Sequence, residues 1–286
     1  MINKIMKISG EKAYPKDLAR IDLSQISGDI REVKDVSYSD DGIPEHKLDI
    51  YYSDDGNLKP VLIDIHGGGF ISYGKEFDRV YANVFAQKGF TVFEIDFRLA
   101  YPEYTVFDQI EDIDKAVRRI VSNAASYGGD TDRLYIAGHS SGCVLAAAEA
   151  LLTLSSEMRS DYGFDDKDYQ YKGILLDCGL MHFYKNSIAY NGMRKMVFPK
   201  NYEEDKRYGY LLFDENEDIK KLPKTALITN EKDILMKMTY HFEKILVNNN
   251  VEHRLFDKGS KGHTGAVFKP CLNGYDLIGE VAGYLL

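Results

Sequence analysis

Short apolar runs recur along the chain and alternate with longer stretches in which apolar and polar residues mix. The runs lie at residues 61–65, 90–96, 134–137, 174–178 and 224–230. Continuous apolar runs of this length are typical of parallel strands that helices cover on both faces. Residues 106–120 carry Val or Ile at intervals of three or four, which predicts an amphipathic helix. The pattern therefore predicts an α/β domain built on a mostly parallel sheet.

Two segments depart from this alternation. Residues 35–39 and 47–52 are interpreted as an antiparallel pair that opens the sheet, joined through Asp41 and Gly42. Residues 179–223 are rich in aromatic and Met side chains but contain no clear strand. These side chains either line a pocket or attach the segment to the rest of the domain, and the pattern leaves both readings open.

The pentapeptide Gly138-His139-Ser140-Ser141-Gly142 joins an apolar strand to an alanine-rich helix. A strand, a sharp turn and a helix are the context in which G-x-S-x-G forms a nucleophile elbow. The two glycines leave room for a tight backbone turn. Ser140 is then expected at the carboxyl end of the sheet, with its hydroxyl exposed. The sequence therefore predicts Ser140 as a nucleophile.

A second motif, His66-Gly67-Gly68-Gly69-Phe70, directly follows an apolar strand. Acyl transfer by a serine passes through an oxyanion that needs preorganised N–H donors. Successive glycines let the main chain approach a substrate carbonyl without interference from a Cβ. We expect the backbone N–H groups of Gly68, Gly69 and Ser141 to form this oxyanion hole. The alternative that Gly67 replaces one of the two glycines stays open.

These motifs, together with Asp96-Phe97-Arg98-Leu99-Ala100 between them, resemble the hormone-sensitive-lipase-like branch of the α/β-hydrolases. The resemblance extends from about residue 36 to the C-terminus. It implies a serine carboxylesterase or lipase with an eight-stranded, mostly parallel sheet, helices on both faces and a small cap. On this view residues 1–286 form one α/β-hydrolase domain. The cap would comprise roughly residues 180–222, with a contribution from residues 1–30.

A nucleophilic serine needs a base, which follows it in the chain order of α/β-hydrolases. His263 lies in the glycine-rich segment Gly259–Gly265, between the last predicted strand and the last predicted helix. A loop at the carboxyl edge of the sheet suits a base that must pivot, so His263 is the predicted base. His253 lies in a strand pattern, His241 in a helical run and His182 at the start of the expected cap.

The acid that orients this base is expected after the strand at residues 224–230. Asp233 fits the G-x-x-D-x-L pattern of the family, with Asn230 where glycine is usual. Glu231 is the rival, and Asp257 is a weaker candidate. Asp233 is predicted to hold the imidazole tautomer and to stabilise the imidazolium.

The predicted activity is hydrolysis of small or short-chain acyl esters through a Ser-His-Asp triad and an acyl-enzyme intermediate. Other enzymes on the same scaffold are alternatives: an arylformamidase, an amidase or an acetyl-sugar deacetylase. A binding protein that has kept the fold without catalysis is a further alternative from a different class.

No cofactor and no metal are expected. The segment 69–75 matches G-x-x-x-x-G-K, but Glu76 stands where a phosphate-binding loop needs Ser or Thr. The seven histidines show no H-x-x-x-H spacing, and the three cysteines show no C-x-x-C spacing. Cys143, Cys178 and Cys271 are interpreted as small apolar residues rather than as disulfide partners.

The formal net charge is −9, which argues against nucleic acid or an anionic membrane surface as a partner. The N-terminal residues lack the apolar stretch of a signal peptide, and no run of about 18 apolar residues could span a bilayer. We therefore expect a soluble, cytoplasmic protein whose partner is a small-molecule ester. The oligomeric state stays open, with a homodimer as one option.

Overall fold

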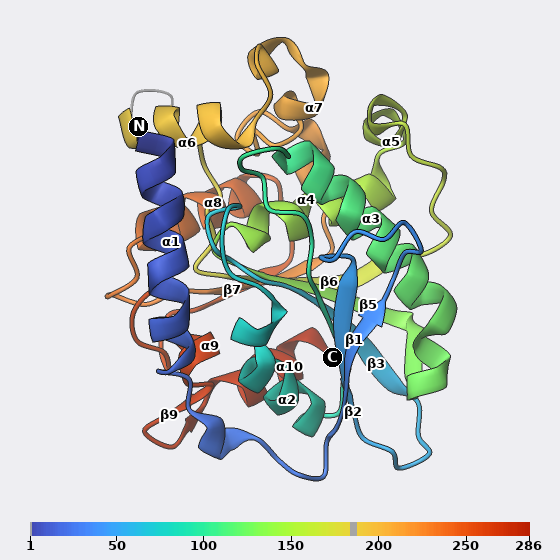
Figure 1. Ribbon diagram of the computed structural model, residues 1–286. Coiled ribbons are helices and arrows are strands. Elements are labelled where there is room, and N and C mark those ends of the chain that lie inside the picture. Colours follow the sequence, from blue (N-terminus) through green and yellow to red (C-terminus); the bar gives the residue numbers. More distant parts are fainter. Residues whose placement is uncertain (1, 184–187) are drawn as a thin grey trace.

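The computed structural model describes residues 2–183 and 188–286 and shows a twisted sheet between layers of helices (Figure 1). The sheet contains eight strands in the order β1-β2-β4-β3-β5-β6-β7-β8. These strands are β1 (Arg31–Ser37), β2 (Lys47–Tyr52), β3 (Lys59–Ile65), β4 (Thr91–Ile95), β5 (Gly129–His139), β6 (Tyr171–Asp177), β7 (Lys224–Ile228) and β8 (His253–Phe256). The first two strands pair antiparallel, β2 is antiparallel to β4, and the remaining pairs are parallel. The predicted eight-stranded, mostly parallel α/β-hydrolase sheet is confirmed.

The described residues form ten α-helices, most of which connect consecutive strands. They are α1 (Ile2–Leu18), α2 (Arg79–Gln87), α3 (Val106–Asn123), α4 (Gly142–Leu154), α5 (Ser156–Tyr162), α6 (Ile188–Val197), α7 (Lys206–Gly209), α8 (Met236–Asn248), α9 (Gly265–Phe268) and α10 (Leu277–Leu285). Short 3-10 turns add η1 (Leu23–Gln25), η2 (Lys75–Phe77), η3 (Ala124–Tyr127), η4 (Tyr202–Glu204) and η5 (Glu217–Lys221).

Alternate residues of the central strands pack into two separate hydrophobic cores. Ile63 and Ile136 pack with α3, α4 and α8 in one buried cluster. Leu62 and Tyr135, their neighbours in sequence, pack with α2 and α10 in the other. Because side chains alternate across a strand, a run that is apolar throughout buries both faces. This explains why the central strands are continuous apolar runs.

The strand order reverses between β3 and β5. The chain passes from β3 outward to β4 and then returns to place β5 on the other side of β3. In open α/β sheets such a reversal leaves a crevice at the carboxyl ends of the two strands. The glycine triplet follows β3 and Ser140 follows β5, so the topology brings both motifs to this crevice.

The structure adds elements that the sequence pattern did not predict. Two short strands, β9 (Cys271–Leu272) and β10 (Tyr275–Asp276), form a separate antiparallel pair before the last helix. The opening strand begins at Arg31, four residues before its predicted start. Two-residue strands are too short to produce a periodic hydrophobic signal, which explains why the pattern missed β9 and β10.

The segment between β6 and β7 contributes no strand among its described residues; it contains α6, α7, η4 and η5. In Figure 1, α6 and α7 lie above the sheet, and α1 runs down one side with its start beside α6. The aromatic side chains of this segment pack on one another. Phe198 lies 5.0 Å from Tyr208 and 5.6 Å from both Phe183 and Phe107, measured between ring centroids. The contact with Phe107 attaches the segment to α3. Of the two interpretations, these contacts favour the one in which the aromatic residues attach the segment to the rest of the domain.

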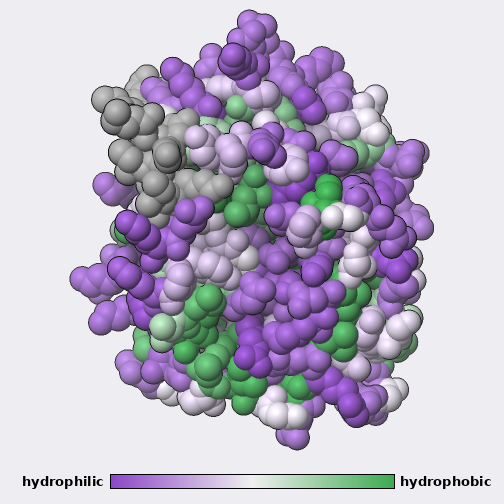
Figure 2. Space-filling view, in the orientation of Figure 1, coloured by the Kyte–Doolittle hydropathy of each residue, from purple (hydrophilic) through white to green (hydrophobic). Residues whose placement is uncertain are grey.

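The face of the molecule that is seen in Figure 1 is mostly hydrophilic, and its hydrophobic residues form several separate groups (Figure 2). Within the described ranges, no helix is both long and apolar enough to cross a membrane.

Candidate active site

Ser140 occupies a strained turn at the end of β5. Its φ is 51°, in the left-handed region that L-residues with a side chain rarely adopt. A Cβ at position 138 would lie 2.4 Å from the Gly142 carbonyl oxygen, and one at position 142 would lie 2.3 Å from the Ile65 carbonyl oxygen. Only glycine fits at these two flanking positions. The turn leaves Ser140 partly exposed at the crevice, as the motif predicted.

The structure brings Ser140, His263 and Asp233 together from three separate loops. His263 Nε2 lies 2.9 Å from Ser140 Oγ, and His263 Nδ1 lies 2.7 Å from Asp233 Oδ1. The His263 side chain is 27% exposed, whereas that of Asp233 is fully buried. Both distances allow hydrogen bonds, so a proton can pass between the hydroxyl and the imidazole while the carboxylate holds the ring.

Asp233 is held by more than His263. The Thr229 hydroxyl donates to its Oδ2 at 2.8 Å, and the Leu235 N–H donates to its Oδ1 at 2.9 Å. Burial alone would raise the pKa of this carboxyl. The hydrogen bonds from His263, Leu235 and Thr229 outweigh burial and hold the pKa below its usual value. Asp233 is therefore ionised at neutral pH.

The alternative candidates for the acid and the base lie away from Ser140. Glu231 and Asp257, the rivals of Asp233, are exposed. The ring of His253 lies 2.8 Å from the Val251 carbonyl oxygen, and His182 and His241 both contact Asp214. Of the described histidines, His263 alone lies within hydrogen-bond distance of Ser140.

Asn230 positions the loop that carries His263, a role that the sequence did not reveal. Its side-chain amide donates to the Gly262 carbonyl oxygen at 2.9 Å and accepts from the Gly262 N–H at 2.9 Å. It also donates to Ser260 Oγ at 3.2 Å. The one available signal was its place in the acid motif, where the family usually has a glycine that could make none of these side-chain contacts.

The glycine loop after β3 approaches the elbow closely. Gly68 has a φ of 109°, and a Cβ there would lie 1.8 Å from the Ser72 carbonyl oxygen. A Cβ at position 67 would lie 3.2 Å from Ser140 Cβ. Among the described residues, no acceptor engages the backbone N–H of Gly68, Gly69 or Ser141. The backbone N–H groups of these three predicted donors are therefore not engaged by the described part of the protein.

Ser141 also links the elbow to the glycine loop through its side chain. Its hydroxyl accepts a hydrogen bond from the Phe70 N–H at 3.2 Å, and the residue is 2% exposed. From the sequence, only the backbone N–H of Ser141 was expected to have a role. The hydroxyl fixes the spacing between the two segments that carry the predicted oxyanion donors.

His66 holds the glycine loop through one hydrogen bond and one ring contact. Its Nδ1 lies 2.8 Å from the Gly67 carbonyl oxygen, and its ring stacks on Phe97 with centroids 4.2 Å apart. Burial lowers the pKa of His66 to about 4, so the ring is neutral at neutral pH. A neutral ring can stack and donate one hydrogen bond without the penalty of a buried charge.

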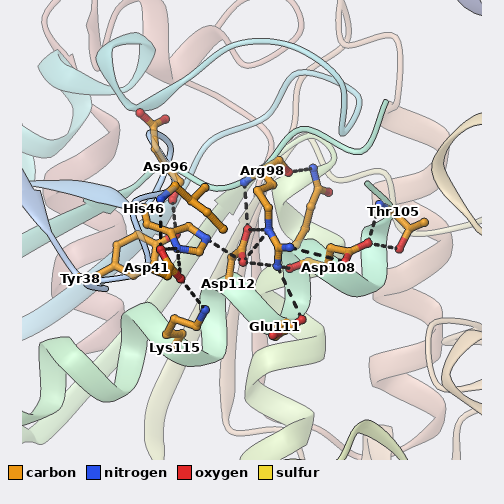
Figure 3. A network of polar contacts seen from close by, with 12 residues as sticks. Tyr38, Asp41, His46, Asp96, Arg98, Thr105, Asp108, Glu111, Asp112 and Lys115 are labelled. Atoms are coloured by element: carbon orange, nitrogen blue, oxygen red, sulfur yellow. Dashed lines mark hydrogen bonds and ion pairs between the residues drawn. The ribbon is translucent and has the colours of Figure 1, made fainter. Parts of the chain in front are cut away.

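Below the loop, a polar network ties α3 to the segment that follows β4 (Figure 3). Arg98 pairs with Asp112 at 2.6 Å, and the ring of His46 lies between Asp112 and Asp41 at 2.9 and 2.8 Å. Gln109, on the same helix, donates to the carbonyl oxygens of Phe70 and Arg98 at 2.8 Å each. The network therefore anchors the end of the glycine loop to α3.

Asp96 lies at the edge of this network, and the protonation of its carboxyl group should make the stability of the protein depend on pH. Burial raises the pKa of its carboxyl to about 7, although the Lys75 N–H donates to it. The folded protein thus binds a proton here more tightly than the unfolded chain, and the associated stabilisation is lost as the pH rises toward 7. Asp96→Asn removes this dependence. Between pH 5 and pH 8 we expect the variant to gain about 3 kcal/mol relative to the natural protein.

Urea unfolding of both proteins at several pH values measures this difference. Asp257→Asn, which changes an exposed carboxyl, is the matched control and should track the natural protein. Parallel stability curves for Asp96→Asn and the natural protein would contradict the assignment.

A buried histidine braces the strands beneath the elbow. His139 Nδ1 lies 3.0 Å from Asp177 at the end of β6, and its Nε2 lies 3.2 Å from Asp64 in β3. Burial disfavours the charged ring, but the carboxyl groups of Asp64, Asp78 and Asp177 outweigh burial and raise the pKa of His139. A charged imidazolium therefore ties three neighbouring strands together directly before Ser140.

The site opens into a cavity of about 360 Å³. Its wall includes Ser140, His263 and the three glycines. Asp17, Arg20 and Lys261 add charged groups, and Tyr73, Phe77 and Phe268 add aromatic ones. Asp17 and Arg20 come from the N-terminal segment, and the Tyr73 hydroxyl donates to Asp17 at 2.5 Å.

Lys75 and the cysteines behave as structural groups. Lys75, the lysine of the phosphate-loop-like sequence, is buried and pairs with Asp35 and Asp49 at 2.9 and 3.0 Å. This lysine is therefore engaged with carboxylates rather than free for a phosphate. The three cysteines are free thiols, and Cys143 is buried, with its Sγ 2.9 Å from the Gly138 carbonyl oxygen.

Curated relatives align with part of this chain. A probable isoprenylcysteine alpha-carbonyl methylesterase of Oryza sativa subsp. japonica is 36% identical over 109 residues, which are 38% of this chain and 25% of that protein. A probable carboxylic ester hydrolase of Mycobacterium tuberculosis is 29% identical over 169 residues, 58% of this chain and 38% of that protein. The chain thus spans well under half the length of these relatives.

Solved structures share the whole fold. Esterase B from Lactobacillus rhamnosis, inhibited by a tributyrin phosphonate, has a TM-score of 0.86 at 21% identity, covering 99% of this chain and 93% of that one. The hyperthermophilic esterase of Pyrobaculum calidifontis has a TM-score of 0.74 at 20% identity, covering 99% and 92%. At this level of identity, the likeness establishes the α/β-hydrolase fold.

The family model described as BD-FAE matches residues 48–207, which is more than half of the chain. The match includes both the glycine triplet and the elbow. Together with the fold, it confirms the α/β-hydrolase resemblance that these motifs predicted. This chain belongs to the BD-FAE family of α/β-hydrolases.

Proposed function

We propose that this protein is a serine carboxylesterase that hydrolyses small or short-chain acyl esters. The observation that carries the proposal is the continuous contact from Asp233 through His263 to Ser140, at 2.7 and 2.9 Å, beside a glycine-lined cavity. The names of the relatives, which are esterases and ester hydrolases, agree with this activity.

In this mechanism, His263 Nε2 accepts the proton of Ser140 as the serine oxygen attacks the ester carbonyl. The negative charge on the carbonyl oxygen is stabilised by the N–H groups of Gly68, Gly69 and Ser141, or by Gly67 in place of one glycine. The imidazolium then protonates the leaving alcohol, which leaves an acyl group on Ser140. Water, deprotonated by His263, attacks this acyl group and restores the free serine. Asp233 holds the ring and stabilises its charged form.

The cavity supports a preference for small substrates. Its volume of about 360 Å³ is near the lower end of the range for ligand pockets. Charged groups at Asp17, Arg20 and Lys261 share the wall with aromatic ones, so a long alkyl chain would have to desolvate them. We propose that residues 180–222 form a cap, with the N-terminal segment contributing Asp17 and Arg20 to the cavity.

A series of p-nitrophenyl esters tests this proposal. We expect kcat/KM to be highest for acetate or butyrate and to be at least about tenfold lower for the dodecanoate. The methylene groups of a long acyl chain would find too little apolar surface in this cavity to gain binding energy. Spectrophotometric release of p-nitrophenol measures the rates. A preference for the dodecanoate would contradict the size assignment.

A wider panel of substrates, with the products separated and quantified by chromatography, distinguishes the alternatives on this scaffold. Formamides, amides and acetylated sugars are included at matched concentrations. Faster turnover of any of these than of simple esters would assign an arylformamidase, an amidase or a deacetylase instead.

We further propose that the protein acts on a small-molecule ester in the cytoplasm without a nucleic-acid partner. The net charge of −9 supports the second point, since a polyanion would be repelled.

A further inference from the structure

A polar cluster outside the predicted triad joins three segments that are distant in sequence. It consists of His182, which follows β6, Asp214, which precedes η5, and His241 on α8. His182 Nδ1 lies 2.5 Å from Asp214 Oδ2, and His241 Nε2 contacts the other oxygen of the same carboxylate. The ring centroids are 5.0 Å apart. One carboxylate therefore lies between two imidazole nitrogens.

The atoms at this cluster are those that a first-row transition metal prefers. Two imidazole nitrogens and one carboxylate oxygen lie within 4.8 Å of one another. Zn²⁺ bound by three protein ligands keeps a fourth position for water. The side chains of His182, Asp214 and His241 are 25%, 31% and 40% exposed, so an ion and its water can reach them. Metals bind aspartate as the carboxylate and histidine through an unprotonated ring nitrogen, so both side-chain types are chemically suited to this role.

Two other groups of metal-binding side chains occur among the described residues: the first coincides with the predicted triad, and the second is buried. One is Cys178 with Asp233 and His263, which places a metal on the predicted triad. The other is Asp64, Asp78 and His139, whose members are at most 1% exposed and whose histidine already lies between two carboxylates. The cluster around Asp214 combines ligands of the right type with access from solvent.

We propose that His182, Asp214 and His241 bind a divalent transition-metal cation, with Zn²⁺ the best match. The sequence did not predict this site because its ligands are separated by 32 and 27 residues and form no short motif. His182 and Asp214 lie in the segment between β6 and β7, and His241 lies on the helix that follows β7. A bound ion would therefore fasten this segment to α8.

Metal binding to the full chain, without an affinity tag and after removal of metals by a chelator, tests the proposal. We expect one equivalent of Zn²⁺ by equilibrium dialysis and a visible absorption band with Co²⁺, which reports nitrogen and oxygen ligands in a low-symmetry site. At a free Zn²⁺ concentration about 100 times Kd, the melting temperature should rise by about 4 °C.

Three substitutions locate the ion, each with little change in side-chain volume. Asp214→Asn, His182→Gln and His241→Gln should each weaken Zn²⁺ binding by at least about tenfold, because the loss even of a residue that only supports a ligand costs that much. His253→Gln, at a partly buried histidine of β8, is the matched control and should bind Zn²⁺ as the natural chain does. Circular dichroism establishes that each variant is folded.

Three results would overturn the proposal. The first is that no stoichiometric binding occurs at about 100 μM Zn²⁺. The second is that folded Asp214→Asn binds as tightly as the natural chain, which would place the ion elsewhere, including at the predicted triad. The third is that His253→Gln alone loses binding. These measurements detect the metal directly, so their outcome is independent of whether the chain hydrolyses esters.

Discussion

Replacing Ser140 with Ala is expected to lower kcat for p-nitrophenyl acetate by at least about 10⁴-fold. The variant cannot form the acyl-enzyme, and the remaining groups can only orient a water molecule. The fold should persist, because the substitution keeps the Cβ at a position whose φ is 51° and removes only the contact with His263. Initial rates under saturating substrate measure the effect.

Ser160→Ala is the matched control for this prediction. Ser160 is an exposed serine in α5, outside the cavity wall, so its removal should leave kcat within about twofold. A fluorophosphonate probe adds a second readout. It should label the natural protein and Ser160→Ala on Ser140, and it should fail to label Ser140→Ala. Retention of ester turnover by folded Ser140→Ala would exclude the proposed mechanism. Absence of both labelling and turnover in the natural protein would favour a non-catalytic role for the fold.

The elbow and the glycine triplet could be predicted from the sequence because local geometry imposes them. The elbow needs glycine at positions 138 and 142, because any Cβ there would collide with a backbone carbonyl. The glycine triplet is constrained in the same way at Gly68. Such requirements act within a few residues, so they leave a motif in the sequence. The sheet was predicted for a related reason, since burial on both faces leaves continuous apolar strands.

The parts that the sequence missed depend on contacts between distant segments. Asn230 fixes the His263 loop from 32 residues away, and the Ser141 hydroxyl reaches Phe70 across 71 residues. Neither contact leaves a periodic or local pattern. The resemblance implied that residues 1–30 contribute to the cap, but it did not indicate that Asp17 and Arg20 line the cavity. The topology alone brings these groups together.

Asp233→Ala is expected to have the second largest effect, a loss of about 10⁴-fold in kcat/KM for p-nitrophenyl acetate. The substitution removes the negative charge beside the imidazolium and the acceptor for His263 Nδ1, which lies 2.7 Å away. Glu231→Gln, which neutralises the exposed rival two residues earlier, is the matched control and should change kcat/KM by no more than about twofold. If Glu231→Gln were the more damaging change, the acid would have to be reassigned.

Asp233→Asn separates the charge from the positioning role of this side chain. Asp233 Oδ1 accepts from both His263 and the Leu235 N–H, whereas Oδ2 faces the Thr229 hydroxyl, which can also accept. An asparagine can therefore keep its oxygen toward His263 and donate its NH₂ to Thr229, which preserves the reactive tautomer. Only the charge is lost in that orientation, so Asp233→Asn should retain more activity than Asp233→Ala. Equal loss in the two variants would mean that the amide turns its NH₂ to His263 and holds the ring in the tautomer that cannot accept the proton of Ser140.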